Sequence, residues 1–129
     1  MSTTTEQTLK MLHDLRFTTP DIEASAVVSH EGFIIASLLP ADVEAERMAA
    51  VSTAMLTLGI KTAADLRQGL LHQVLIRSED GCVAVVNAGA EAVLGVLARK
   101  NAQPCLLFTE MRRAAAQIGL LLSQSPEPG

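Results

Sequence analysis

The sequence predicts one α+β domain, a single five-stranded antiparallel sheet flanked by helices in the chain order α-β-β-α-β-β-β-α. Three observations point to this class. The chain has 129 residues, a length that one hydrophobic core can serve. Apolar residues make up 49% of it, more than a disordered chain carries. Five short segments of strand character are separated by glycine-containing turns or by helices, and three longer segments place apolar residues at helical spacing.

A first helix is predicted near the N-terminus, ending before Pro20. Thr3 precedes Glu6, and Thr4 precedes Gln7, by the three residues that separate the partners of a capping box. The apolar residues that follow recur at three- and four-residue intervals, as on one face of a helix. Proline lacks the backbone N–H that a helix interior requires, so the helix should not extend to it.

A hairpin is predicted next. Residues 22–29 (IEASAVVS) and 33–38 (FIIASL) are mostly small, β-branched or apolar, and the HEG between them is polar. Gly32 can adopt the positive φ of a tight turn at no steric cost. Pro40 closes the second strand. His30 stands beside a glutamate in this turn, but neighbouring side chains diverge, so a solvated turn is favoured over a metal site.

The longest helix is predicted at residues 42–66, with Asp42 as its N-cap. On a helical wheel its apolar side chains form two stripes, and its polar face is narrow. So wide an apolar surface must be buried on two sides. One side covers the chain's own sheet, and we favour a second subunit on the other, with the terminal helices as the alternative. The stripes are Met48, Val51, Met55 and Leu58, and Ala45, Ala49, Leu56, Ile60 and Ala63, with Ser52 and Gly59 between them to allow close approach.

Three more strands and a last helix complete the predicted domain. Gly81 ends the turn between the first two of these strands, and Gly95 inside the third indicates a bulge or a close approach. The strands are predicted at residues 71–77, 82–88 and 92–99, and the helix at 105–122. We expect one domain over residues 1–122, followed by a flexible polar tail at 123–129.

The composition excludes several classes of function. Ten basic residues against fourteen acidic ones give a net charge of −4, the wrong sign for a surface that follows phosphates. The chain has three Phe and neither Tyr nor Trp, so it lacks the aromatic residues on which single-strand binders stack bases. No segment approaches the roughly 18 consecutive apolar residues of a membrane helix, and no signal peptide is recognisable. We expect a cytoplasmic protein that binds no nucleic acid and inserts into no membrane.

The residues that carry chemistry are scattered. The histidines at 13, 30 and 72 have no second histidine at helical spacing, and no phosphate-binding glycine loop is present. Cys82 and Cys105 are expected to be buried, reduced thiols. We therefore predict no enzyme activity, no catalytic or metal-binding residues and no cofactor. Five arginines are candidates for an arginine finger on a partner's phosphate, although solvated helix faces explain them more simply: Arg47, Arg77, Arg99, Arg112 and Arg113.

Four segments in order resemble the Roadblock family, the dynein-light-chain and GTPase-regulator type, over about residues 8–118. They are AVVSHEGFIIASLLP, the long Ala-rich helix, QVLIRSEDGCVAVVNAGAEAVLGVLARKNA and LLFTEMRRAA. Their order and spacing carry the resemblance. The chain departs from the family at Ser29, where members commonly have an acidic residue, and at Glu23 and Ala24, where a glycine often enters the strand.

The resemblance implies a profilin-like fold and a non-enzymatic dimer, formed with itself or with a Roadblock paralogue. In such dimers the long helices pair and the strands that follow them join the two sheets. Similar bacterial members bind a small Ras-like GTPase across the dimer and remodel it without inserting an arginine. On this basis the dimer interface is predicted at Met48, Val51, Ser52, Met55, Leu58, Gly59, Val74 and Ile76, and the docking zone for the GTPase at Glu44, Arg47 and Val51.

Three functions follow as hypotheses. The first is a dimeric regulator that modulates the nucleotide cycle of a small Ras-like GTPase. The second is a structural adaptor or scaffold subunit that dimerises and recruits protein partners without changing the rate of nucleotide turnover. The third and least favoured is a small-ligand sensor, because no polar cluster falls among the predicted core positions.

Overall fold

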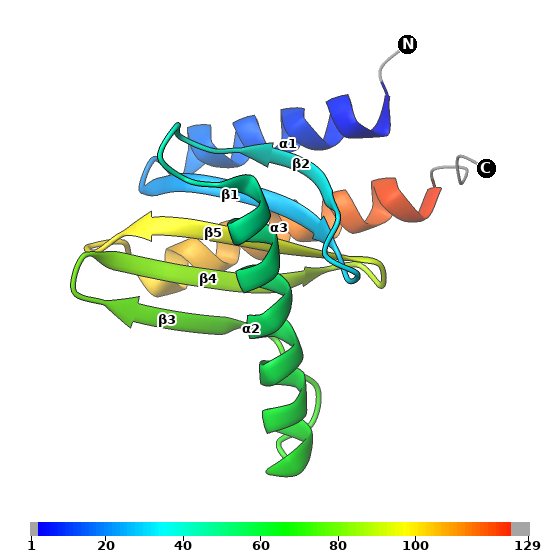
Figure 1. Ribbon diagram of the computed structural model, residues 1–129, viewed down its shortest axis with the longest axis vertical. Coiled ribbons are helices and arrows are strands. Elements are labelled where there is room, and N and C mark those ends of the chain that lie inside the picture. The colour runs from blue at the N-terminus through cyan, green and yellow to red at the C-terminus, as the bar shows by residue number, and fades with distance from the viewer. Residues whose placement is uncertain (1–2, 125–129) are drawn as a thin grey trace.

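The computed structural model describes residues 3–124. Its elements follow the predicted order, and the strands join one antiparallel sheet (Figure 1), which confirms the α+β class. Residues 22–29 and 92–99 are strands with the predicted bounds. The elements are α1 (Thr4–Thr18), β1 (Ile22–Ser29), β2 (Ile34–Leu38), α2 (Ala45–Asp65), β3 (Val74–Ser78), β4 (Gly81–Ala88), β5 (Ala92–Arg99) and α3 (Pro104–Gln124).

The strand order across the sheet is β2-β1-β5-β4-β3, and all neighbouring pairs are antiparallel. β2 and β3 are therefore the two edges. Residues directly opposite one another in antiparallel strands project from the same face. Two cross-strand rows lie side by side on one face of the sheet. The Ile76 row consists of Ile76, Val83, Leu97 and Ala24, and the Val74 row consists of Val74, Val85, Gly95 and Ala26.

α1 and α3 cover one face of the sheet, and α2 crosses the other (Figure 1). α1 begins as predicted, because the Thr3 side chain accepts a hydrogen bond from the backbone N–H of Glu6 at 3.1 Å. The main core lies between these two helices and the sheet. Its largest fully buried side chains are Leu12, Ile22, Leu94, Leu107, Met111 and Ile118.

α2 packs on the opposite face through two smaller clusters. Its first half places Met48 and Ala49 against β1, and the next turns place Met55 and Leu56 against β4 and β5. Between the clusters the helix comes very close to the sheet, since a Cβ added to Gly95 would overlap the Ser52 hydroxyl. The close approach predicted at Gly95 is therefore present, and its partner is α2.

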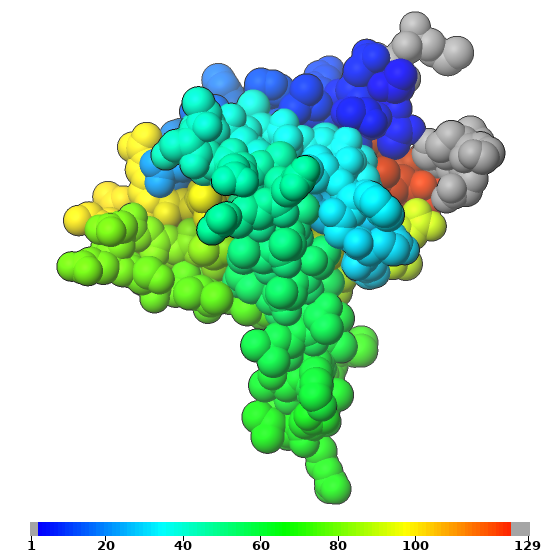
Figure 2. Space-filling model, viewed as in Figure 1, coloured from blue at the N-terminus to red at the C-terminus, as the bar shows by residue number. Residues whose placement is uncertain are grey.

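The last part of α2 extends beyond the sheet. A Cβ added to Gly59 would lie 2.7 Å from a methyl group of Val74, so Gly59 sits directly over β3. Because β3 is the edge strand, the helix beyond Gly59 has no strand of its own chain beneath it, and it projects past the sheet (Figures 1 and 2). We call residues 60–70 the α2 overhang.

Several predicted boundaries were wrong. α2 begins at Ala45, and its N-cap is Glu44, which makes no side-chain capping bond. Asp42 lies before the helix, where a turn is closed by a hydrogen bond from the Val43 N–H to the Pro40 carbonyl at 3.1 Å. β3 starts at residue 74 rather than 71, because the chain returning from the overhang reaches β4 only there. α3 includes residues 123 and 124 of the predicted tail, and residues 125–129 lie outside the described range.

Candidate interaction surface

The side chains that could bind a metal or act in catalysis do not cluster among the described residues. His13, His30 and His72 are all exposed, and residues 3–124 contain no group of three His, Cys, Asp or Glu side chains that could hold a metal ion. No helix in the same range is long and apolar enough to cross a membrane. The structure thus offers no assembled polar site on the described residues.

The two cysteines are both free, and the prediction that both are buried was wrong for Cys105. Cys105 lies in the first turn of α3, on the side that faces solvent. Cys82 is half-buried in β4. Burial raises the pKa of the Cys82 thiol, while the nearby Arg77 guanidinium and a backbone hydrogen bond from Ala98 lower it by less.

Exposed apolar side chains concentrate on one part of the molecule. Among the described residues, six of the eleven large exposed hydrophobic side chains lie between positions 51 and 76. That stretch holds α2, the connection after it and the edge strand β3. An apolar surface this concentrated marks an interaction site. The six are Val51, Leu58, Ile60, Leu66, Leu70 and Ile76.

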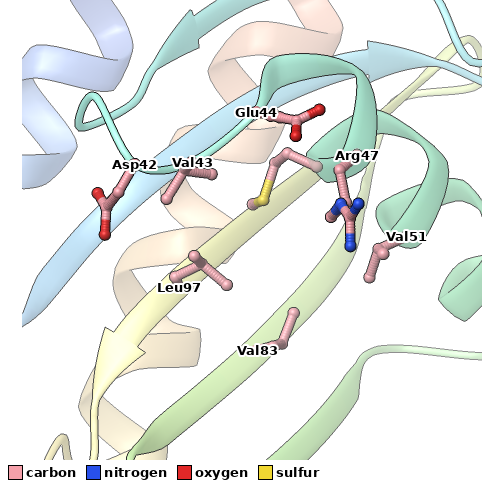
Figure 3. Close-up of a pocket in the computed structure, with 8 residues that line it drawn as sticks. Asp42, Val43, Glu44, Arg47, Val51, Val83 and Leu97 are labelled. Carbon is pink, nitrogen blue, oxygen red and sulfur yellow. The ribbon is translucent and has the colours of Figure 1, made fainter.

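A groove opens beside the first half of α2, with a volume of about 450 Å³. It exists because α2 covers the Val74 row and leaves Val83 and Leu97 of the neighbouring Ile76 row only half-buried. Val83 and Leu97 of that row form the floor, and Figure 3 shows Arg47 and Val51 of α2 facing the same space. We call it the α2 groove. Its lining residues are Asp42, Val43, Glu44, Arg47, Met48, Val51, Val83 and Leu97.

The rim of the α2 groove is charged and its floor is apolar. Asp42 and Glu44 contribute carboxylates, and Arg47 is the one side-chain hydrogen-bond donor among the lining residues. Arg47 makes no hydrogen bond or ion pair with any described residue, whereas Arg112 donates to the Gln73 amide oxygen and Arg113 pairs with Glu110. A single donor does not build a polar ligand site, so the groove suits an apolar side chain of a protein partner.

The structure separates the residues predicted for the dimer interface into two sets. Met48, Ser52 and Met55 face the chain's own sheet and are at least nine-tenths buried, and Gly59 lies against Val74 and Leu71. These residues have little surface left for a partner. Val51, Leu58 and Ile76 remain exposed, and Val74 is half-buried.

The predicted docking residues do come together. Glu44, Arg47 and Val51 all line the α2 groove. Sequence reasoning missed the floor residues, Val83 and Leu97, and the exposed residues of the overhang, Leu66 and Leu70. The two-residue alternation of the strands could have placed Val83 and Leu97 on the α2 side of the sheet, but only the tertiary structure shows that α2 leaves them uncovered.

Comparisons with known proteins agree with this architecture. The Roadblock/LC7 domain model matches residues 8–98. The uncharacterized protein MJ1340 of Methanocaldococcus jannaschii is 38% identical over 100 residues, which cover 78% of this chain and 87% of that protein. Among solved structures, a Roadblock/LC7 domain from Streptomyces avermitilis has a TM-score of 0.83 at 21% identity, covering 90% of this chain and 98% of that chain. The gliding protein mglB from Thermus thermophilus also has a TM-score of 0.83, at 14% identity, covering 97% and 95%.

Proposed function

This chain belongs to the Roadblock/LC7 domain family, and we propose that it is a non-enzymatic, dimeric regulator of a small Ras-like GTPase. In this proposal it pairs with itself or with a Roadblock paralogue, acts in the cytoplasm and changes the rate at which the GTPase exchanges or hydrolyses nucleotide. The observation that carries the proposal is the concentration of exposed apolar side chains on α2, the overhang and β3.

The dimer is supported by the free edge of β3. An edge strand presents unpaired backbone N–H and C=O groups, which a second strand can satisfy. If β3 of two copies pair in antiparallel fashion, a two-fold axis perpendicular to the sheet joins the two sheets into one. The same axis brings the α2 helices alongside each other. Leu58, at 66% exposure, lies on the side of α2 that also carries Val51 and would be buried by this contact.

Docking of the GTPase is supported by the rim of the α2 groove. Glu44 at the N-cap of α2 and Arg47 in its first turn are exposed charges, and Arg47 has no partner among the described residues. Charged rims around apolar contacts guide protein association and fix its orientation. Fold similarity to the gliding protein mglB fits a partner of this class, which the family resemblance also implies.

The dimer is tested by Leu58→Asp. A carboxylate at the subunit contact would be buried without a partner, which costs several kcal/mol, so the variant should sediment as a folded monomer. The matched control is Leu106→Asp, because Leu106 of α3 has the same 66% exposure on the opposite face of the molecule. Met55 is unsuitable here, since it is buried in the chain's own core. A native-sized dimer for Leu58→Asp would refute the proposed contact.

The regulatory activity is tested with the Ras-like GTPases of the same genome. We expect one of them to bind the full-length protein in calorimetry and to change its nucleotide exchange or hydrolysis rate. Arg47→Glu should weaken binding about tenfold or more, whereas Arg113→Glu on α3 should leave it unchanged. Binding with unaltered nucleotide turnover would favour the adaptor function instead, and no binding to any of these GTPases would refute the regulator.

A further inference from the structure

The α2 groove and the overhang fit each other in two copies of this chain. We propose that, in the dimer, Leu66 of each copy inserts into the α2 groove of the other. The inference rests on the proposed dimer and adds what fills the groove. It follows from the reach of the overhang, the position of the two-fold axis and the direction in which Leu66 points.

The length of the overhang matches the position of the groove. Gly59 lies over Val74 of β3, and Leu66 follows seven residues later. At a rise of 1.5 Å per residue, Leu66 is about 10 Å further along the helix axis. Neighbouring strands are about 4.8 Å apart, so this is two strand spacings beyond β3. In a continuous dimer sheet the second strand beyond β3 is β4 of the other copy, which carries Val83 of the groove floor.

The position of the two-fold axis places the overhang of one copy on the groove side of α2 in the other copy. Val74 lies beneath α2, and from there β3 runs toward Ile76, which pairs with the groove residue Val83. The two-fold axis lies between the two β3 strands. To bring the α2 helices into contact it must lie level with Leu75 and Ile76, about 4–5 Å along β3 from Val74 toward the groove. Packed helices lie about 8–10 Å apart, and the Ile76 row is about 6.6 Å from the Val74 row. The second helix thus stands above the side of the sheet that α2 leaves uncovered.

The helical spacing points Leu66 toward the sheet of the other copy. Met48, Ser52, Met55 and Gly59 recur every three or four residues on the side of α2 that faces the sheet, and Leu66 continues this series. The chain's own sheet ends before Leu66, which leaves it 65% exposed. Leu70, in the same connection, is 92% exposed. The groove volume of about 450 Å³ is ample for a leucine side chain.

A disulfide trap tests the contact in the full-length protein. Cys82 and Cys105 are first replaced by serine, and Leu66→Cys is then combined with Val83→Cys. Within one chain these positions lie on opposite sides of the β3 edge, well beyond the roughly 4.4–6.8 Å between Cα atoms that a disulfide requires. Mild oxidation should therefore give a covalent dimer in most of the protein. The matched control pairs Leu106→Cys with Val83→Cys, because Leu106 is exposed to the same degree as Leu66 but lies on the far face.

The outcomes separate this inference from the dimer itself. A disulfide-linked dimer from Leu66→Cys with Val83→Cys, or from Leu66→Cys with Leu97→Cys as the second floor position, supports the insertion when the control stays unlinked. A non-covalent dimer in sedimentation that forms neither disulfide overturns the insertion and leaves the proposed dimer standing. A monomer for the unmodified protein overturns both.

Discussion

Ser52 and Gly95 set the distance between α2 and the sheet. A Cβ on Gly95 would lie 3.1 Å from Ser52 Cβ and would overlap the Ser52 hydroxyl. That hydroxyl is fully buried and has no hydrogen-bond partner. An unsatisfied buried hydroxyl costs free energy, so the hydrogen-bonding capacity of Ser52 does not explain its presence. Its small size does, because serine is among the few side chains that fit this gap.

Gly95→Ala should lower the free energy of unfolding by about 1–3 kcal/mol, because the added methyl group forces α2 away from the sheet. Ser52→Ala removes the unsatisfied hydroxyl and should be neutral or stabilising by up to about 1 kcal/mol. In the Ser52→Ala background, the cost of Gly95→Ala should be smaller. Urea unfolding of the four proteins forms a double-mutant cycle, and strictly additive effects would contradict the contact.

The two cysteines should differ in reactivity. The thiolate is the reactive form, and burial both shields Cys82 and raises the pKa of its thiol. We expect iodoacetamide to modify exposed Cys105 at least about tenfold faster at neutral pH. Raising the pH should accelerate modification of Cys82 beyond the range where an ordinary thiol, with a pKa of about 8.5, has levelled off. Equal rates, read by mass spectrometry of the two peptides, would contradict the burial of Cys82.

The sequence predicted the strands of this protein better than the surfaces of its long helix. Residues 22–29 and 92–99 are bounded by turns and Pro or Gly, and their limits were correct. The helical wheel of α2 showed two apolar stripes, but a wheel carries no information on which direction faces the sheet. Ser52 was consequently assigned to a subunit contact, whereas its close approach is to Gly95 of the same chain.

The start of α2 was misplaced for a local reason. Asp42 is a strong N-cap residue, yet the chain between Pro40 and Val43 forms a hydrogen-bonded turn, and the helix begins only after Glu44. A competing turn of this kind depends on how the chain leaves β2. The α2 groove could not be predicted from the sequence for a similar reason, because its depth depends on where α2 crosses the sheet.

The two edge strands should behave differently in hydrogen exchange. β2 packs beside α1, whereas β3 has a free edge in the single chain. Strand pairing in the dimer would protect the outward amides of β3. Exchange in residues 74–78 should therefore be slower at high protein concentration than at low concentration, and residues 34–38 should show no change. In Leu58→Asp the concentration dependence of β3 should disappear, and its persistence would argue against strand pairing.

The two faces of the whole molecule are covered unequally. α1 and α3 close one face over a large core, while α2 leaves Val83 and Leu97 only half-buried and extends beyond the β3 edge of the sheet. The uncovered residues of the Ile76 row are apolar, and the overhang carries the exposed side chains of Leu66 and Leu70. In the proposed dimer, a second copy would complete the layer that one copy leaves unfinished.

Thermal stability should consequently depend on protein concentration. Association of the native state favours it by mass action, so a hundredfold rise in concentration should raise the Tm by about 4 °C. Leu58→Asp should melt at one temperature across the same range, and Leu106→Asp should behave as the unmodified protein. A constant Tm for the unmodified protein would indicate that pairing contributes nothing to its stability.

In the proposed dimer, the overhang would also make the lifetime of each copy in a cell depend on its abundance. If the proposed dimer buries Leu66 and Leu70, an unpaired copy would display both side chains to chaperones and proteases. Copies that find no partner would then be removed faster than paired ones. We expect a pulse-chase experiment to show faster turnover of Leu58→Asp than of Leu106→Asp. Exposed leucines at the end of a projecting helix would thus limit the lifetime of unpaired subunits.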